Sequence, residues 1–103
     1  MITIELKPRE ITMSGHAGSA PYGQDLVCAA SSALITSLAE FMARNEDKLT
    51  EHIVNIDRGE AYIKVSPVDG FKDMCDGAFS VITAGFELLS NLHPEYILVK
   101  SCI

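Results

Sequence analysis

The sequence lacks the paired cysteines that indicate a zinc site or a disulfide framework. Cys28, Cys75 and Cys102 are an odd number at wide spacings, and no CxxC or Cys/His pair has zinc spacing. Free thiols in a reducing compartment are the simpler interpretation. The sequence therefore predicts no metal and no cofactor.

Leader and membrane signals are also missing. Residues 1–7 have no basic start followed by a continuous apolar run, and no stretch approaches the roughly 18 apolar residues of a membrane span. Basic residues are scarce, with 8 Lys and Arg against 14 Asp and Glu and a net charge of -6. Direct nucleic-acid binding needs clustered Lys and Arg, whereas an acidic surface suits a basic protein partner. We therefore expect a cytoplasmic protein with no membrane or nucleic-acid partner.

What is present suits one globular domain over residues 1–103. The chain has 103 residues, 48% of them hydrophobic, which is enough to bury one core without metal or disulfide. Alternating apolar residues predict strands at 2–7 and 11–14, and a hairpin of 52–56 with 61–65. The near-continuous apolarity of 96–99 predicts a closing strand at the centre of the sheet.

Helical spacing of apolar residues predicts two helices. The first follows Asp25 as its N-cap and frays near residues 45–47, and the second follows Asp69 and stops at His93-Pro94. The order ββα-ββα-β predicts a two-layer α+β fold, with both helices on one face of a mixed or antiparallel sheet. The expected buried stripes are Val27, Ala30, Leu34, Leu38, Phe41 and Met42, then Phe71, Met74, Cys75, Ala78, Ile82, Gly85, Leu89 and Leu92.

The most informative stretch joins the second strand to the first helix. His16 follows the strand, and a loop over residues 17–24 with two glycines and a proline leads to Asp25 and Cys28. With Asp25 as N-cap, Cys28 is the third helical residue, where unpaired N–H groups and the helix dipole favour a thiolate. A loop of this length allows His16 to fold back beside Cys28, the pairing of an activated nucleophile.

Spacing alone leaves structural alternatives open. A cysteine in an alanine-rich helix can be a small buried hydrophobe, and a histidine at a strand end can be solvated. Asp25 either orients the imidazole or only caps the helix. Ser32, one turn after Cys28, either contacts substrate or bonds its own i−4 carbonyl.

The blocks Gly15-His16-Ala17 and Gly23-Gln24-Asp25-Leu26-Val27-Cys28-Ala29-Ala30 resemble the ribosomal-processing cysteine protease Prp family. The similarity extends over essentially the whole chain. One departure is Ser31, which precedes Ser32 where the family has an aliphatic residue; we expect Ser31 to be tolerated if it faces solvent.

The resemblance implies a cysteine endopeptidase with His16 and Cys28 as its catalytic dyad and Asp25 and Ser32 in support. The implied substrate is the N-terminal extension of a large-subunit ribosomal protein, the twenty-seventh of the bacterial set, which is removed before ribosome assembly. The resemblance also implies a cytoplasmic homodimer. The alternative is a ribosome-associated module that binds without cutting. The loop over residues 17–24 is a candidate lid with Gly18 and Gly23 as hinges, and the expected substrate-binding residues are Gly15, Ala17, Gly18, Tyr22 and Gly23.

Overall fold

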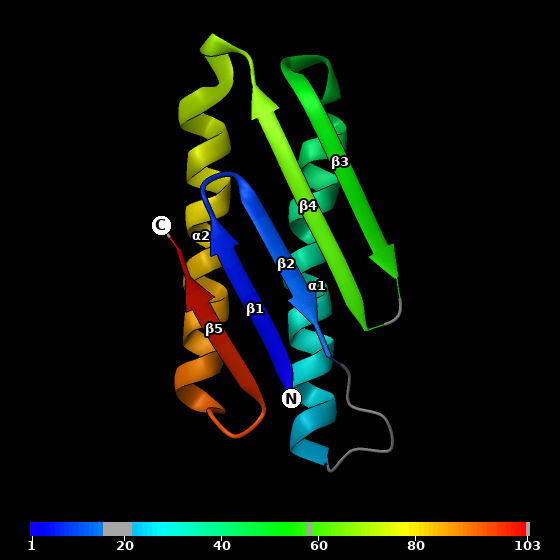
Figure 1. Cartoon of the computed structure of the whole chain (residues 1–103), viewed down its shortest axis with the longest axis vertical. Coiled ribbons are helices and arrows are strands. Elements are labelled where there is room, and N and C mark those ends of the chain that lie inside the picture. The colour runs from blue at the N-terminus through cyan, green and yellow to red at the C-terminus, as the bar shows by residue number, and fades with distance from the viewer. Residues whose placement is uncertain (16–21, 58, 103) are drawn as a thin grey trace.

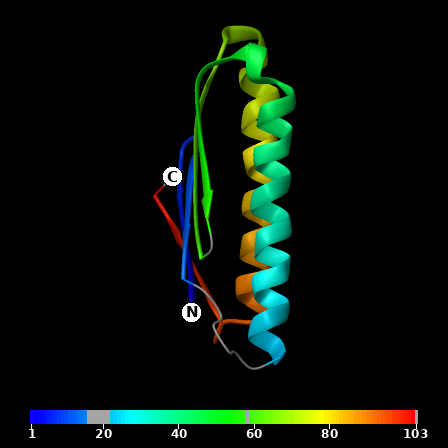
Figure 2. The same ribbon diagram turned by 90° about the vertical axis from the view of Figure 1, so that its right-hand side faces the viewer.

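Two layers make up the protein, in a computed structural model that describes residues 1–15, 22–57 and 59–102. One layer is a five-stranded mixed sheet, and the other consists of two long helices that cover the same face of that sheet (Figure 1, Figure 2). The element order is ββα-ββα-β, with short 3-10 turns before β3 and before α2. The predicted two-layer α+β architecture is therefore confirmed.

The sheet has the strand order β3-β4-β2-β1-β5, in which only the β1–β5 pair is parallel. The prediction of a central closing strand was wrong, because β5 lies at the edge, and Leu98 is 44% exposed there. Strand β2 pairs with one edge of β1, so β5, which follows α2, pairs with the other edge. The strands are β1 Ile2–Lys7, β2 Glu10–Ser14, β3 Leu49–Asp57, β4 Glu60–Pro67 and β5 Ile97–Ser101.

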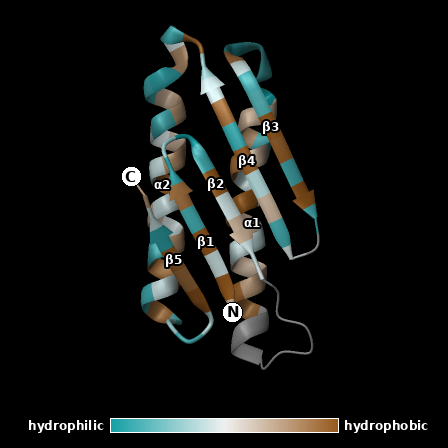
Figure 3. Ribbon diagram, viewed as in Figure 1, coloured by the Kyte–Doolittle hydropathy of each residue, from teal (hydrophilic) through white to brown (hydrophobic). Residues whose placement is uncertain are grey.

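Alternation along the strands divides the sheet into a buried face and an exposed face, visible as alternating colours in Figure 3. On β1, Ile2, Ile4 and Leu6 are buried under the helices. The residues between them face away from the helices, as the period of two requires. The β3–β4 turn contains Gly59 with φ 80°, a positive value that glycine adopts without steric cost.

Helix α1 spans Tyr22–Arg44, so it begins earlier than the sequence predicts. Its core-facing stripe is also shifted: Ala30, Leu34 and Phe41 are only partly buried. By length and composition alone, residues 26–44 could cross a membrane, contrary to our expectation that no stretch would. Here the helix packs its buried side on the sheet. The fully buried side chains are Val27, Ser31, Ile35, Leu38 and Met42.

Helix α2 spans Lys72–Leu92 and follows a 3-10 turn at Asp69–Phe71. Asp69 therefore does not cap α2; Phe71 holds that position without a side-chain hydrogen bond. Met74 and Leu92, expected in the core, are 59% and 62% exposed. The predicted stripe was right at Phe71, Cys75 and Ile82 and wrong at Met74 and Leu92, because both sides of α2 are rich in apolar residues. The core side consists of Phe71, Cys75, Phe79, Ile82 and Phe86.

Candidate functional site

Cys28 is the seventh residue of α1 and is partly buried against the hydrophobic core. In a helix of 3.6 residues per turn it lies about 100° round from Val27. Leu34 and Phe41, on the opposite flank, face α2: a Cβ at Gly85 would contact Leu34, and the Phe41 side chain lines a groove with Met74. Cys28 therefore lies on the flank of α1 that α2 leaves open.

The earlier start of α1 corrects two predictions about this site. Asp25 is inside the helix and is not its N-cap, and Tyr22 and Gly23 belong to the helix instead of the loop. Because Cys28 is six residues beyond Tyr22, it lies about 9 Å along the axis from the helix start. The dipole effect is concentrated in the first turn. The N–H of Cys28 is also beyond the first four, which have no partner in a helix.

Gly15 fixes the direction in which the chain leaves β2. It has φ 96°, and a Cβ at this position would overlap the backbone carbonyl oxygen of Met1. Only glycine fits such a conformation beside another backbone. His16, Ala17 and Gly18 lie outside the described residues, so their predicted roles stay predictions. Figure 1 shows that the end of β2 and the beginning of α1 lie at the same end of the sheet.

The two serines after Cys28 have opposite environments. Ser32 is exposed, on the same flank as Cys28 and one turn further along the helix. Ser31 is 0% exposed, and its Oγ has no hydrogen-bond partner among the residues that the structure describes. Exposure to solvent, the condition on which Ser31 was expected to be tolerated, is not met, because the core-facing side of α1 runs through residue 31. A one-residue offset in the predicted stripe hid this from the sequence.

The other thiols are unsuited to catalysis. Cys75 is 0% exposed in the core, as predicted, and burial raises the pKa of its thiol. The neighbouring Asp76 carboxylate raises this pKa further, while Arg9 opposes it. Cys102 is exposed after β5. Of the cysteines, Cys28 alone is both next to the core and partly accessible.

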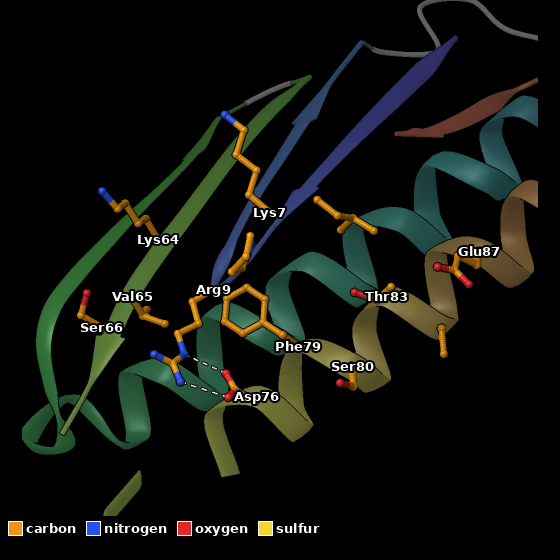
Figure 4. Close-up of a pocket in the computed structure, with 13 residues that line it drawn as sticks. Lys7, Arg9, Lys64, Val65, Ser66, Asp76, Phe79, Ser80, Thr83 and Glu87 are labelled. Atoms are coloured by element: carbon orange, nitrogen blue, oxygen red, sulfur yellow. Dashed lines mark hydrogen bonds and ion pairs between the residues drawn. The ribbon is translucent and has the colours of Figure 1, made fainter. Parts of the chain in front are cut away.

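A large cavity lies elsewhere in the structure. It has a volume of 690 Å³ and lies between the β1–β2 turn and α2, with an Arg9–Asp76 ion pair beside it (Figure 4). Leu6 and Lys7, at the far end of β1 from Ile2, line it, so it does not contain Cys28. Within residues 1–15, 22–57 and 59–102 no three His, Cys, Asp or Glu side chains could hold a metal ion.

The fold and the position of Cys28 define a small α+β protein with an accessible cysteine on its first helix. Residues 1–98 match the family of the cysteine protease Prp, and the chain belongs to that family. The predicted enzyme class, a cysteine protease, is thereby confirmed. The ribosomal processing cysteine protease Prp of Mycoplasma genitalium is 28% identical over 100 residues, which cover 97% of this chain and 95% of that one.

Solved structures share the fold. A Prp from S. aureus, in complex with a covalently linked product peptide, superimposes with a TM-score of 0.77 at 22% identity, covering 98% of this chain and 99% of that chain. SMU.848 from Streptococcus mutans has a TM-score of 0.73 at 27% identity, covering 97% of this chain and 90% of that chain. Both likenesses extend over the complete two-layer domain, so the element order is that of the family.

Proposed function

We propose that this protein removes the N-terminal extension of a large-subunit ribosomal protein, the twenty-seventh of the bacterial set, with Cys28 as nucleophile and His16 as its base. The family match over residues 1–98 carries the proposal, because it includes both side chains. The relative from Mycoplasma genitalium is a ribosomal processing protease. The S. aureus protein has been solved with a substrate peptide and with a covalently linked product peptide.

The reaction follows the chemistry of a thiol protease. His16 takes the proton from the Cys28 thiol, and the thiolate attacks the scissile carbonyl carbon. His16 then gives the proton to the leaving amine as the peptide C–N bond breaks. Water hydrolyses the remaining thioester and regenerates the thiol. Since Cys28 lies beyond the first helical turn, activation of its thiol depends on His16 more than on the helix dipole.

The backbone N–H groups at the beginning of α1 are the proposed hydrogen-bond donors to the oxyanion of the tetrahedral intermediate. The first four N–H groups of the helix, from Tyr22 to Asp25, have no acceptor in the helix ladder. A side chain on an α-helix leans toward the N-terminus, so the Cys28 sulfur is directed back toward these groups.

We also infer that the protein is a cytoplasmic homodimer, as the family relationship implies. The net charge of -6 supports a basic substrate, because opposite charge speeds the encounter of protease and ribosomal protein. Nothing in the described residues favours the alternative of a binding module that does not cut.

The test is incubation of the purified protein with the extended ribosomal protein, followed by mass measurement of the product. We expect one internal cut by the wild type and none by Cys28→Ala or His16→Ala. Cys102→Ser is the matched control, because that thiol is exposed and outside the proposed site. It should cleave at the wild-type rate.

Circular dichroism melting of both inactive variants separates lost chemistry from lost fold. Complete processing by Cys28→Ala would exclude the proposed nucleophile. Tight binding of the precursor without cleavage by the wild type would establish the binding module instead.

A further inference from the structure

The sheet ends in two strands, β3 and β5, whose outer edges have no neighbouring strand among the described residues. The β3 edge is the longer one, with nine residues in Leu49–Asp57 against five in Ile97–Ser101. An outer edge carries a row of backbone N–H and C=O groups that an extended segment of another protein can pair with. The two edges differ in how many of these groups the chain leaves accessible.

Hydrogen bonds inside the sheet show which β3 residues face outward. The N–H of Val65 on β4 donates to the carbonyl oxygen of Arg9, on the side away from β3. Backbone groups alternate sides along a strand, so the next residue, Lys64, directs its groups toward β3, where it pairs with Ile53. By the same alternation, the β3 residues whose N–H and C=O groups point away from β4 are His52, Val54 and Ile56. Each presents one donor and one acceptor along the outer edge.

The outer edge of β5 is partly used by the chain itself. Ile97 donates its N–H to the His93 carbonyl oxygen at 3.3 Å. Its own carbonyl oxygen accepts a hydrogen bond from Ser90 Oγ, also at 3.3 Å. The β5 edge is therefore both shorter than the β3 edge and already bonded at its first residue.

The outer edge of β3 is on the same side of the protein as Cys28. Helix α1 packs beneath β4 and α2 packs beneath β5, so the flank of α1 away from α2 faces the β3 side of the sheet (Figure 1). Cys28 lies on that flank. Ile56 shares the helix-facing side of β3 with Val54 but is 44% exposed, where the end of β3 extends beyond α1. A strand added here would direct every second side chain toward Ile56 and this flank.

Charge determines which kind of segment this edge favours. Residues 46–60 carry five Asp and Glu against two Lys and Arg, whereas residues 93–102 carry one of each. Like charges on an edge strand oppose pairing with an identical chain, whereas a basic segment is attracted. Between Glu51 and Asp57 the register with β4 is regular and the sequence has no proline, so the backbone suits an added strand.

We propose that the extended segment of the precursor around the scissile bond adds to the outer edge of β3 as a further strand, paired with His52, Val54 and Ile56. This rests on the protease function proposed above and adds to it the surface that aligns the substrate. A basic ribosomal substrate has the charge that this edge favours. Backbone pairing supplies affinity, and the alternate side chains supply specificity.

Val54→Pro tests the pairing. Proline removes the outward N–H of residue 54 and leaves the hydrogen bonds between β3 and β4 in place. We expect the KM for the precursor to rise about 10-fold with kcat nearly unchanged, because a hydrogen bond that aligns the substrate is lost.

Val99→Pro is the matched control on the other edge. Residues 96 and 102 bond to β1, so by alternation the N–H of Val99 also faces outward. Val54 and Val99 both pack partly against the core, so the two substitutions remove similar packing. Val99→Pro should keep the wild-type KM.

A second measurement needs no substitution in the protein. Synthetic substrate peptides that span the cut carry one N-methyl group each, at successive positions, and the wild type is assayed on every peptide. An added strand pairs through every second residue, so kcat/KM should fall about 10-fold at alternate positions and stay near the unmodified value between them.

A folded Val54→Pro with the wild-type KM, or an N-methyl series without alternation, would overturn the pairing while leaving the protease function intact. A wild type that does not cleave the precursor would overturn the protease function and the substrate alignment that rests on it. Calorimetric binding of the precursor to Cys28→Ala, with and without Val54→Pro, measures the edge separately from cleavage. The dissociation constant should rise about 10-fold in the double variant.

Discussion

Arg9 and Asp76 form a bidentate ion pair across 67 residues of sequence, with Nε donating to Oδ1 at 2.8 Å and Nη2 donating to Oδ2 at 3.0 Å. The pair ties the β1–β2 turn to the second turn of α2. Arg9 has φ 59°, an uncommon conformation for a residue with a side chain. The turn therefore directs this guanidinium at the helix.

Replacing Asp76 with Asn should lower stability modestly at neutral pH. The hydrogen bond from Arg9 lowers the pKa of Asp76, so the pair is fully present above the ordinary value of about 3.9 and is lost as pH falls through the lowered pKa. The side chains are 33% and 52% exposed, and solvent screening keeps the loss near 0.5 kcal/mol. Melting temperatures should differ by about 2–4 °C at pH 7 and converge near pH 2. A difference that grows on acidification would contradict this account.

Ser31→Ala should stabilise the protein. The Ser31 hydroxyl is fully buried and has no partner within residues 1–15, 22–57 and 59–102, so alanine removes the cost of burying it while favouring the helix. We expect the free energy of unfolding to rise by about 1 kcal/mol in urea titrations. Ser32→Ala is the control: its side chain is exposed, so stability should stay within about 0.5 kcal/mol. A destabilised Ser31→Ala would show that the hydroxyl has a native partner.

Gly15→Ala should damage both fold and activity. A side chain at φ 96° is strained and would overlap the Met1 carbonyl oxygen, at a cost of about 1–3 kcal/mol. Because Gly15 directly precedes His16, precursor cleavage should fall further than stability alone explains. Gly70→Ala is matched to it, since a Cβ there meets nothing within 4 Å. Equal losses of stability and of precursor cleavage in the two variants would show that Gly15 has no special role in the backbone conformation.

Alkylation should distinguish the three thiols in the native protein. Iodoacetamide should modify Cys28 and Cys102, whereas Cys75 is fully buried, with its pKa raised, and should react only after unfolding. Peptide mass mapping at pH 7 gives the three rates. If His16 activates Cys28, then His16→Ala should slow the alkylation of Cys28 alone, toward the alkylation rate of Cys102. Rapid native modification of Cys75 would disprove its place in the core.

The family motif identified Cys28, but the conformation of the backbone around it is known only from the tertiary structure. Asp25 was expected to cap a helix because aspartate is a strong N-cap residue. The helix instead begins at Tyr22, before Gly23, a residue that favours loops. Tertiary packing overrides such local preferences. Because of this earlier start, by about one turn, Cys28 is not at the helix start; Ser31 is in the core for a separate reason, since it lies on the buried side of α1 with Val27 and Ile35.

Local pattern alone determined the elements and their order. Alternation along Ile2, Ile4 and Leu6, and helical periodicity over α1 and α2, depend only on neighbours in the chain. The sequence therefore predicted two layers and a cysteine on the first helix.

Only the tertiary structure decided which side of each element is buried and what meets across the chain. Helix α2 is apolar on two sides, and contact with the sheet selects Phe79 and Phe86 while leaving Val81 exposed. The edge position of β5 and the Arg9–Asp76 pair have no local signal, because both depend on elements distant in sequence. Which side chains are buried depends on contacts between the two layers, and these contacts join elements that are distant in sequence.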